Sequence, residues 1–237
     1  ISVNGIEVET IKDVNELNQK LVPGEYLEGV VWRGGKQITL RGVLERSPIE
    51  TFIMRVAYEN VTKKNFGRAR LQLDYLSRIN DPRGLYFNAL LHFQGLGVEK
   101  NFKVAERDFS KSAFQIPASA AQLAFLYMTP SSGITNDSQA FFLAKYATEA
   151  GRADGAAALA LAYFRGVGTS KNDSESVKWS RLSAEMGSST GMFLLGARYE
   201  DGAGGIEKNI GLAKLWYRRS RDMNFAPAKN ALSRLGE

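Results

Sequence analysis

The stretch GMFLLGARYEDGAGG at residues 191–205, continued by GLAKLWYRRS at residues 211–220, decides the fold of this chain. Both segments repeat apolar residues at the three- and four-residue spacing of one helix face. Between the two segments, Gly202 and Gly204 are suited to the end of a helix, because glycine readily takes the left-handed backbone conformation that is common there. We therefore expect two helices here, joined by a loop that contains left-handed glycines.

This helix–loop–helix unit recurs along the chain with a period close to 36 residues. One series of aromatic residues keeps steps of 35, 34, 36 and 36: Tyr58, Phe93, Tyr127, Tyr163 and Tyr199. A second series keeps steps of 36, 35, 36 and 37: Gln72, Asp108, Leu143, Trp179 and Trp216. Because one helix pair cannot bury its apolar face alone, a period of about 20–50 residues indicates a stacked array. The sequence predicts a mainly α fold, an α-α superhelix of five helix pairs that begins near residue 48.

Loops, caps and core positions can be predicted unit by unit. The loop glycines expected to include left-handed positions are Gly166, Gly168, Gly202 and Gly204. Asparagine, a favoured N-cap, precedes the expected second helices at Asn65, Asn101, Asn172 and Asn209. The large side chains expected to be buried are Tyr163, Trp179, Leu182, Tyr199, Leu212, Leu215 and Trp216. In one unit, the segment at residues 129–133 replaces the usual glycine loop.

The composition limits the classes of function. The 237 residues carry a formal charge of +6, but the basic residues are mixed with acidic ones except near the C-terminus, so we expect no nucleic-acid binding. No apolar run approaches the roughly 18 residues that a membrane-spanning helix requires. The chain has no cysteine, and His92 is its one histidine. We therefore expect no metal site, no cofactor and no catalytic triad, and an enzyme is not the favoured interpretation.

The repeat units resemble a known family. The pattern Ala/Gly-x-x-x-Leu-Gly/Ala-x-x-Tyr, then Gly-x-Gly, then Ala-x-x-Trp-Tyr is similar to the Sel-one-like repeats, which are relatives of the tetratricopeptide repeats. The resemblance covers residues 84–237 well and residues 48–83 weakly. It implies a superhelical scaffold for protein–protein contacts, and it implies no chemistry.

The first 46 residues have a different character. Short strands are expected around Asn4-Gly5, and a helix is expected at residues 13–21. Two alternating segments, at residues 26–32 and 37–44, predict a hairpin. This order resembles the C-terminal two-thirds of a PDZ domain of the bacterial protease-associated (HtrA) type. The carboxylate-binding loop of that family would lie before Ile1. Either the chain is a fragment of a longer protein, which we favour, or the half-domain serves as a structural cap. We expect this segment to bind C-terminal peptides poorly.

These observations predict three regions and one binding surface. The regions are a partial PDZ-like domain at 1–46, a capping helix pair at 47–83 and repeats at 84–237. In tetratricopeptide-type stacks the first helix of each pair forms the inner, concave wall, which the resemblance places over a set of mostly apolar residues. The expected partner-binding residues are Phe87, Leu91, Gln94, Phe125, Met128, Leu161, Phe164, Arg165, Phe193 and Glu200.

Two functional classes follow from this organisation. The leading hypothesis is a non-enzymatic adaptor that binds a partner protein or peptide, with the bacterial periplasm or cell envelope favoured and the cytoplasm left open. The alternative is the regulatory, substrate-selecting C-terminal part of a PDZ-containing serine protease. The sequence determines neither the partner nor the oligomeric state.

Overall fold

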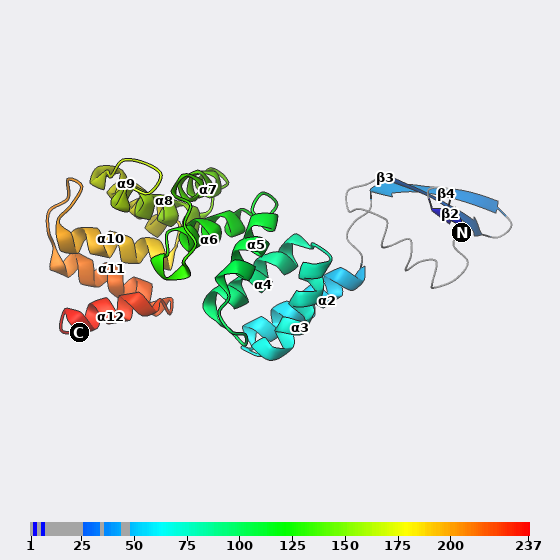
Figure 1. Cartoon of the computed structure of the whole chain (residues 1–237), viewed down its shortest axis with the longest axis horizontal. Helices are drawn as coiled ribbons and strands as arrows, with labels where there is room; N and C mark the ends of the chain where they lie inside the picture. The colour runs from blue at the N-terminus through cyan, green and yellow to red at the C-terminus, as the bar shows by residue number, and fades with distance from the viewer. Residues whose placement is uncertain (1, 4–5, 8–25, 34–35, 44–47) are drawn as a thin grey trace. The chain divides into compact units, whose positions relative to one another are not determined.

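The structure is a computed structural model that describes residues 2–3, 6–7, 26–33, 36–43 and 48–237 of the chain. The chain divides into two compact units, Ile1–Glu59 and Asn60–Glu237. Figure 1 shows the helices and strands of both units.

The first unit contains a four-stranded antiparallel sheet. Its strands are β1 (Ser2–Val3), β2 (Ile6–Glu7), β3 (Tyr26–Arg33) and β4 (Lys36–Val43), in the order β2-β1-β3-β4. The predicted hairpin is confirmed, since β3 and β4 pair along their whole length from Tyr26 opposite Val43 to Arg33 opposite Lys36. The helix expected at residues 13–21 lies outside the described residues.

Residues 48–237 form eleven α-helices and one short 3-10 helix. The α-helices are α2 (Pro48–Thr62), α3 (Phe66–Arg78), α4 (Pro82–Gln94), α5 (Phe102–Ser112), α6 (Pro117–Tyr127), α7 (Asp137–Glu149), α8 (Ala153–Arg165), α9 (Asp173–Glu185), α10 (Ser189–Asp201), α11 (Ile210–Asp222) and α12 (Ala226–Arg234). Ten helices, α2 to α11, stand where five pairs are expected, and packing within a pair is found for the four pairs from α4 to α11. α12 is an additional helix that the pattern does not predict, because its nine residues carry neither the aromatic mark nor a glycine loop.

In the second unit the helices stack in sequence. α4 packs on α5, α6 on α7, α8 on α9 and α10 on α11, and the second helix of each pair also packs on the first helix of the next. The first helices contact one another as well, from α4 to α6, from α6 to α8 and from α8 to α10. Because these helices meet directly, they form the inner row of the stack, and the second helices lie outside it.

The predicted loop glycines are confirmed as left-handed. Gly166, Gly168, Gly202 and Gly204 have φ values of 73°, 65°, 71° and 69°. The close packing of two of these loops accounts for their glycines as well. A Cβ atom on Gly168 would overlap the carbonyl oxygen of Asp137, at the start of α7, and one on Gly204 would overlap that of Asp173, at the start of α9. Each loop therefore lies against the first turn of the preceding second helix.

The asparagine caps are confirmed in three of the four predicted places. The side chains of Asn101, Asn172 and Asn209 accept hydrogen bonds from backbone N–H groups three residues further on, at 3.1, 3.0 and 2.9 Å. Asn65 stands at the N-cap of α3, but its side chain makes no capping hydrogen bond. Asn136 caps α7 in the same way, at 3.1 Å, although its sequence context does not single it out. In that unit, η1 (Pro130–Ser132) replaces the glycine loop.

The predicted burial of the large aromatic residues is confirmed only in part. Tyr163, Trp179, Tyr199 and Trp216 are all half-buried. The indole N–H of Trp179 donates to the carboxylate of Glu175 at 2.9 Å, near the surface of α9.

The prediction is wrong for three leucines on the second helices. Leu182, Leu212 and Leu215 are 37%, 37% and 38% exposed. In α11 the buried residues are instead Ala213, Tyr217 and Ser220, one helix face away. The small residues allow α11 to approach its neighbours closely, and the larger side chains are left outside.

Candidate functional site

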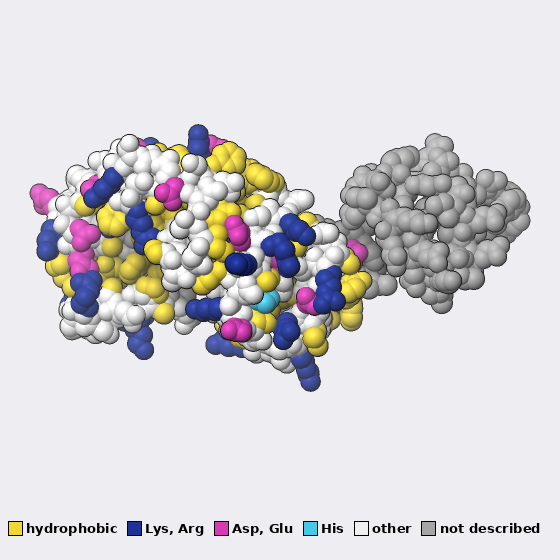
Figure 2. Space-filling view, in the orientation of Figure 1, with side chains coloured by type: hydrophobic (Ala, Val, Ile, Leu, Met, Phe, Trp, Pro, Cys, Tyr) yellow, Lys and Arg dark blue, Asp and Glu magenta, His cyan; other side chains and the backbone are white. Residues whose placement is uncertain are grey.

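The predicted partner-binding residues lie on the four first helices of the repeats, as expected. Phe87, Leu91 and Gln94 are on α4, Phe125 is on α6 with Met128 at its C-cap, Leu161, Phe164 and Arg165 are on α8, and Phe193 and Glu200 are on α10. Because these helices contact one another in sequence, the fold brings the residues into one row. Figure 2 shows apolar side chains gathered over α8 and α10, with Lys and Arg side chains around them.

Two of these residues are not accessible. Leu91 is 2% exposed and Met128 is 4% exposed, so both belong to the core. The prediction that they contact a partner is wrong for the folded chain. Each first helix packs against second helices on both sides of it, which leaves only a narrow strip of its surface in solvent.

The remaining residues of α4, α6 and α8 form a partly accessible surface. Gln94 and Arg165 are exposed, whereas the apolar members are half-buried: Phe87, Phe125, Leu161 and Phe164. Phe125 and Leu161 also pack against the hydrophobic core. The ring of Phe125 therefore has a structural as well as a surface role.

Arg165 has an internal partner. Its guanidinium donates to the backbone carbonyl of Met128 at 2.8 Å, at the C-terminal end of α6. Carbonyls at helix ends lack intrahelical partners, so this bond satisfies one of them. Arg165 thus ties α8 to α6 while much of its side chain stays exposed.

Arg198 is a buried cation that the sequence pattern did not reveal. Its guanidinium carbon lies 3.6 Å from the ring centroid of Phe164, and the residue is 3% exposed. The terminal nitrogen Nη2 donates to Asp201 at 3.3 Å, and the other terminal nitrogen, Nη1, has no hydrogen-bond partner among the described residues. Burial lowers the pKa of this guanidinium, and the nearby carboxylate of Asp201 partly opposes that effect. The position of this arginine, directly before the aromatic mark Tyr199, was the available signal in the sequence.

Phe193 and Glu200 face α12 rather than open solvent. The Phe193 ring centroid lies 5.5 Å from that of Phe225, the N-cap of α12, and 5.4 Å from that of Tyr217. The carboxylate of Glu200 accepts hydrogen bonds from Tyr217, at 2.8 Å, and from both terminal nitrogens of Arg234 in α12. The prediction that Glu200 is free for a partner is wrong, because α12 occupies it.

This polar network makes the stability of the α12 end depend on pH. The hydrogen bond from Arg234 holds the pKa of Glu200 below its usual value, and burial raises the pKa of Tyr217. A depressed carboxylate pKa contributes stability above the unfolded pKa of about 4.3 and loses it as the pH falls through the folded value. We expect Glu200→Gln to destabilise the protein clearly at pH 6.5 and much less at pH 3. The free energy of unfolding, measured in urea at both pH values, tests this, and an equal loss at both would contradict it.

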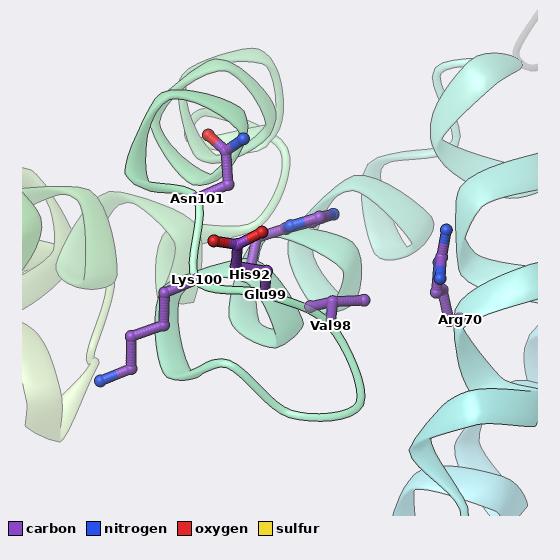
Figure 3. A pocket seen from close by; sticks show the side chains of 6 residues that line it. All are labelled: Arg70, His92, Val98, Glu99, Lys100 and Asn101. Carbon is purple, nitrogen blue, oxygen red and sulfur yellow. The ribbon is translucent and has the colours of Figure 1, made fainter.

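A shallow polar hollow lies between α3 and the loop that joins α4 to α5. Its volume is about 400 Å³, and it is lined by Arg70, His92, Val98, Glu99, Lys100 and Asn101. The side chains do not converge on one point, since Lys100 extends away from Arg70 (Figure 3). The Nδ1 atom of His92 is buried without a hydrogen-bond partner among the described residues. This arrangement defines no catalytic geometry.

The described residues contain neither a metal centre nor a membrane span. Within them, no three His, Cys, Asp or Glu side chains gather as a metal site would require. Over the same residues, no helix has both the length and the apolar character needed to cross a bilayer.

Comparison with known proteins identifies the repeats. The Sel1 repeat family model matches four times, at residues 82–113, 117–151, 153–188 and 189–225, which together make up more than half of the chain. These limits follow the helix pairs from α4 to α11. The match begins at residue 82 and gives no support to the PDZ resemblance of residues 1–46.

Solved structures show the same architecture. A Sel1 repeat protein from Oxalobacter formigenes is 25% identical, with a TM-score of 0.55 over 72% of this chain and 68% of that one. A protective antigen of uropathogenic Escherichia coli is 27% identical, with a TM-score of 0.51 over 68% of this chain but 34% of the antigen. A Sel1 repeat protein from Klebsiella pneumoniae shares the fold at 18% identity, with a TM-score of 0.55 over 79% of this chain and 93% of that one. None of the curated protein sequences is significantly similar to this chain.

Proposed function

The chain belongs to the Sel1 repeat family, and from this premise we propose that it is a non-enzymatic scaffold that binds a partner protein or peptide along its first helices. Sel1 repeat proteins are generally protein-interaction scaffolds. Within this proposal, residues 84–237 supply the binding surface, residues 47–83 cap the stack, and residues 1–46 form a separate PDZ-like module.

One observation carries the proposal. Large apolar side chains on three successive first helices remain partly accessible in the folded chain, at Phe87, Phe125 and Leu161. Exposed apolar side chains that align across several elements are typical of interaction sites, and aromatic anchors usually supply most of the affinity. Gln94 and Arg165 give the row a polar margin, which is the usual surrounding of an apolar interface centre.

Site-specific crosslinking in cells tests this surface. With the photocrosslinker p-benzoylphenylalanine in place of Gln94, we expect irradiation to give a discrete crosslinked partner. Leu161→Gln, which keeps the side-chain volume but adds a polar group, should lower the yield about tenfold if Leu161 is an anchor. The matched control is Leu71→Gln on α3, where the side chain is 71% exposed and lies on a second helix. If the crosslink is lost in the Leu71→Gln control, or if Leu161→Gln leaves its yield unchanged, the partner binds elsewhere on the protein.

A further inference from the structure

α11 has a second apolar face that the fold leaves in solvent. Leu215 is 38% exposed and Met223 is 49% exposed, with the half-buried Trp216 beside them. Leu215 lies opposite the buried Ala213 and Tyr217, Trp216 lies between the two sides, and Met223, the C-cap residue of α11, continues the exposed side about two turns further on. An amphipathic helix of a folded domain normally exposes polar residues on that face.

The preceding second helix repeats part of the feature: Trp179 and Met186 match Trp216 and Met223 in register, whereas Leu182 stands where α11 has Arg219. In α9, Trp179 is half-buried and Leu182 is 37% exposed, and Met186, at the C-cap of the helix, is 41% exposed. α10 packs against both α9 and α11, so the two faces belong to the same end of the stack. We call these six residues the outer stripe: Trp179, Leu182, Met186, Leu215, Trp216 and Met223.

Cations accompany the outer stripe. The ammonium of Lys178 lies 5.0 Å from the ring centroid of Trp179, and the guanidinium carbon of Arg219 lies 4.7 Å from that of Trp216. Such cation–π contacts hold positive charge directly over the apolar surface. The indoles and the cations are therefore presented to solvent together.

The charge on α9 and α11 is incompletely balanced. Arg181 and Arg219 form no ion pair with any described residue, whereas Lys178 pairs with Glu175 at 3.2 Å. Among the acidic residues of these two helices, only Glu185 lacks an ion pair within the described part of the chain. The surface thus combines an apolar stripe with an excess of unpaired cations.

We propose that the outer stripe docks an acidic amphipathic helix of a partner protein, at a site separate from the row of first helices. Apolar side chains of such a helix would cover the leucines, methionines and indoles, and its carboxylates would meet Arg181 and Arg219. A second copy of this chain fits less well, because self-association through the stripe would bring those same cations together.

Two synthetic peptides test the proposal with the full chain. Both carry leucines at i, i+3, i+4 and i+7 of a stabilised helix, and their flanking positions are glutamate in one and lysine in the other. Titration calorimetry is expected to show at least about tenfold tighter binding of the glutamate peptide. The double variant Leu215→Ser, Met223→Ser is expected to weaken that binding about tenfold, as loss of anchor residues does. Arg219→Glu should weaken the glutamate peptide and spare the lysine peptide.

Control variants test whether peptide binding depends on the outer stripe. Leu71→Ser, on the equivalent face of α3, and Leu161→Gln, on the first-helix row, should leave the affinity unchanged. Circular dichroism should show unchanged thermal unfolding for the double variant, because both side chains are substantially exposed. Equal affinity for the two peptides, or no binding of either, would overturn the proposal. Two further outcomes would overturn it if neither peptide binds. One is that the double variant loses a self-association that sedimentation detects in the original chain. The other is that it loses binding to phosphatidylserine vesicles.

Discussion

Gly204→Ala is expected to destabilise the protein by more than about 3 kcal/mol, the size of a severe point mutation. The backbone at Gly204 has a φ of 69°, which costs a residue with a Cβ atom roughly 1–2 kcal/mol. The larger effect comes from packing, because the new Cβ would also lie 2.7 Å from the carbonyl carbon of Asp173 and 2.6 Å from a methyl group of Val177. Backbone atoms at the start of α9 cannot move without disturbing the stack.

The neighbouring glycine is the matched control. Gly205 has a φ of 84°, but a Cβ there would meet no atom within 4 Å. Gly205→Ala should therefore carry only the backbone cost of roughly 1–2 kcal/mol. Urea unfolding followed by circular dichroism gives both free energies. If the two variants lose the same free energy of unfolding, the loop does not pack against α9, and the packing inferred from Gly204 is wrong.

Asp108→Ala is expected to cost about 3–5 kcal/mol, as breaking a buried charged network does. Asp108 is fully buried where three helices meet. Its carboxylate accepts hydrogen bonds from Ser77 of α3 at 3.0 Å, from Asn88 of α4 at 2.8 Å and from Arg107 at 2.6 Å. Truncation would leave two buried donors without an acceptor, and an unpaired buried polar group costs its full desolvation.

Two further variants isolate the cause. Asp108→Asn keeps the size of the side chain and one oxygen for Ser77 and Asn88, so we expect it to lose less than half as much stability. Asp74→Ala removes an exposed ion pair with Arg78, 2.9 Å long on the surface of α3, and should cost under about 1 kcal/mol. Equilibrium unfolding of the three variants gives the ranking. An alanine variant at position 108 as stable as the Asp74 variant would contradict the buried network.

Much of the fold was predictable because its signals are local. The left-handed conformation of Gly168 and the N-caps of Asn101, Asn172 and Asn209 depend on atoms within a few residues in the chain. α12 has local signals of its own, Pro227 in its first turn and the left-handed Gly236 after its end, but it lacks the repeat pattern and was missed. Its position became evident only from contacts made by Phe225.

The candidate site was less predictable, because the exposure of a side chain depends on the residues that pack around it in the folded chain. Leu91 and Leu161 stand on equivalent helices, yet the first is buried and the second half-exposed. Glu200 has the appearance of a free charge in the sequence, but its partner Arg234 is 34 residues away. No local pattern encodes such a contact.

The sequence by itself determined the period, the helix pairs and the chemistry of their loops and caps, since each follows from backbone sterics and short-range hydrogen bonds. Only the tertiary structure decided which face of each second helix is buried. α11 carries two apolar faces, and helical periodicity cannot choose between them. The face with Ala213 and Ser220 is buried because small side chains let neighbouring helices approach closely, and because Tyr217 finds Glu200 there for its hydroxyl group. Leu215 and Met223 consequently remain in solvent.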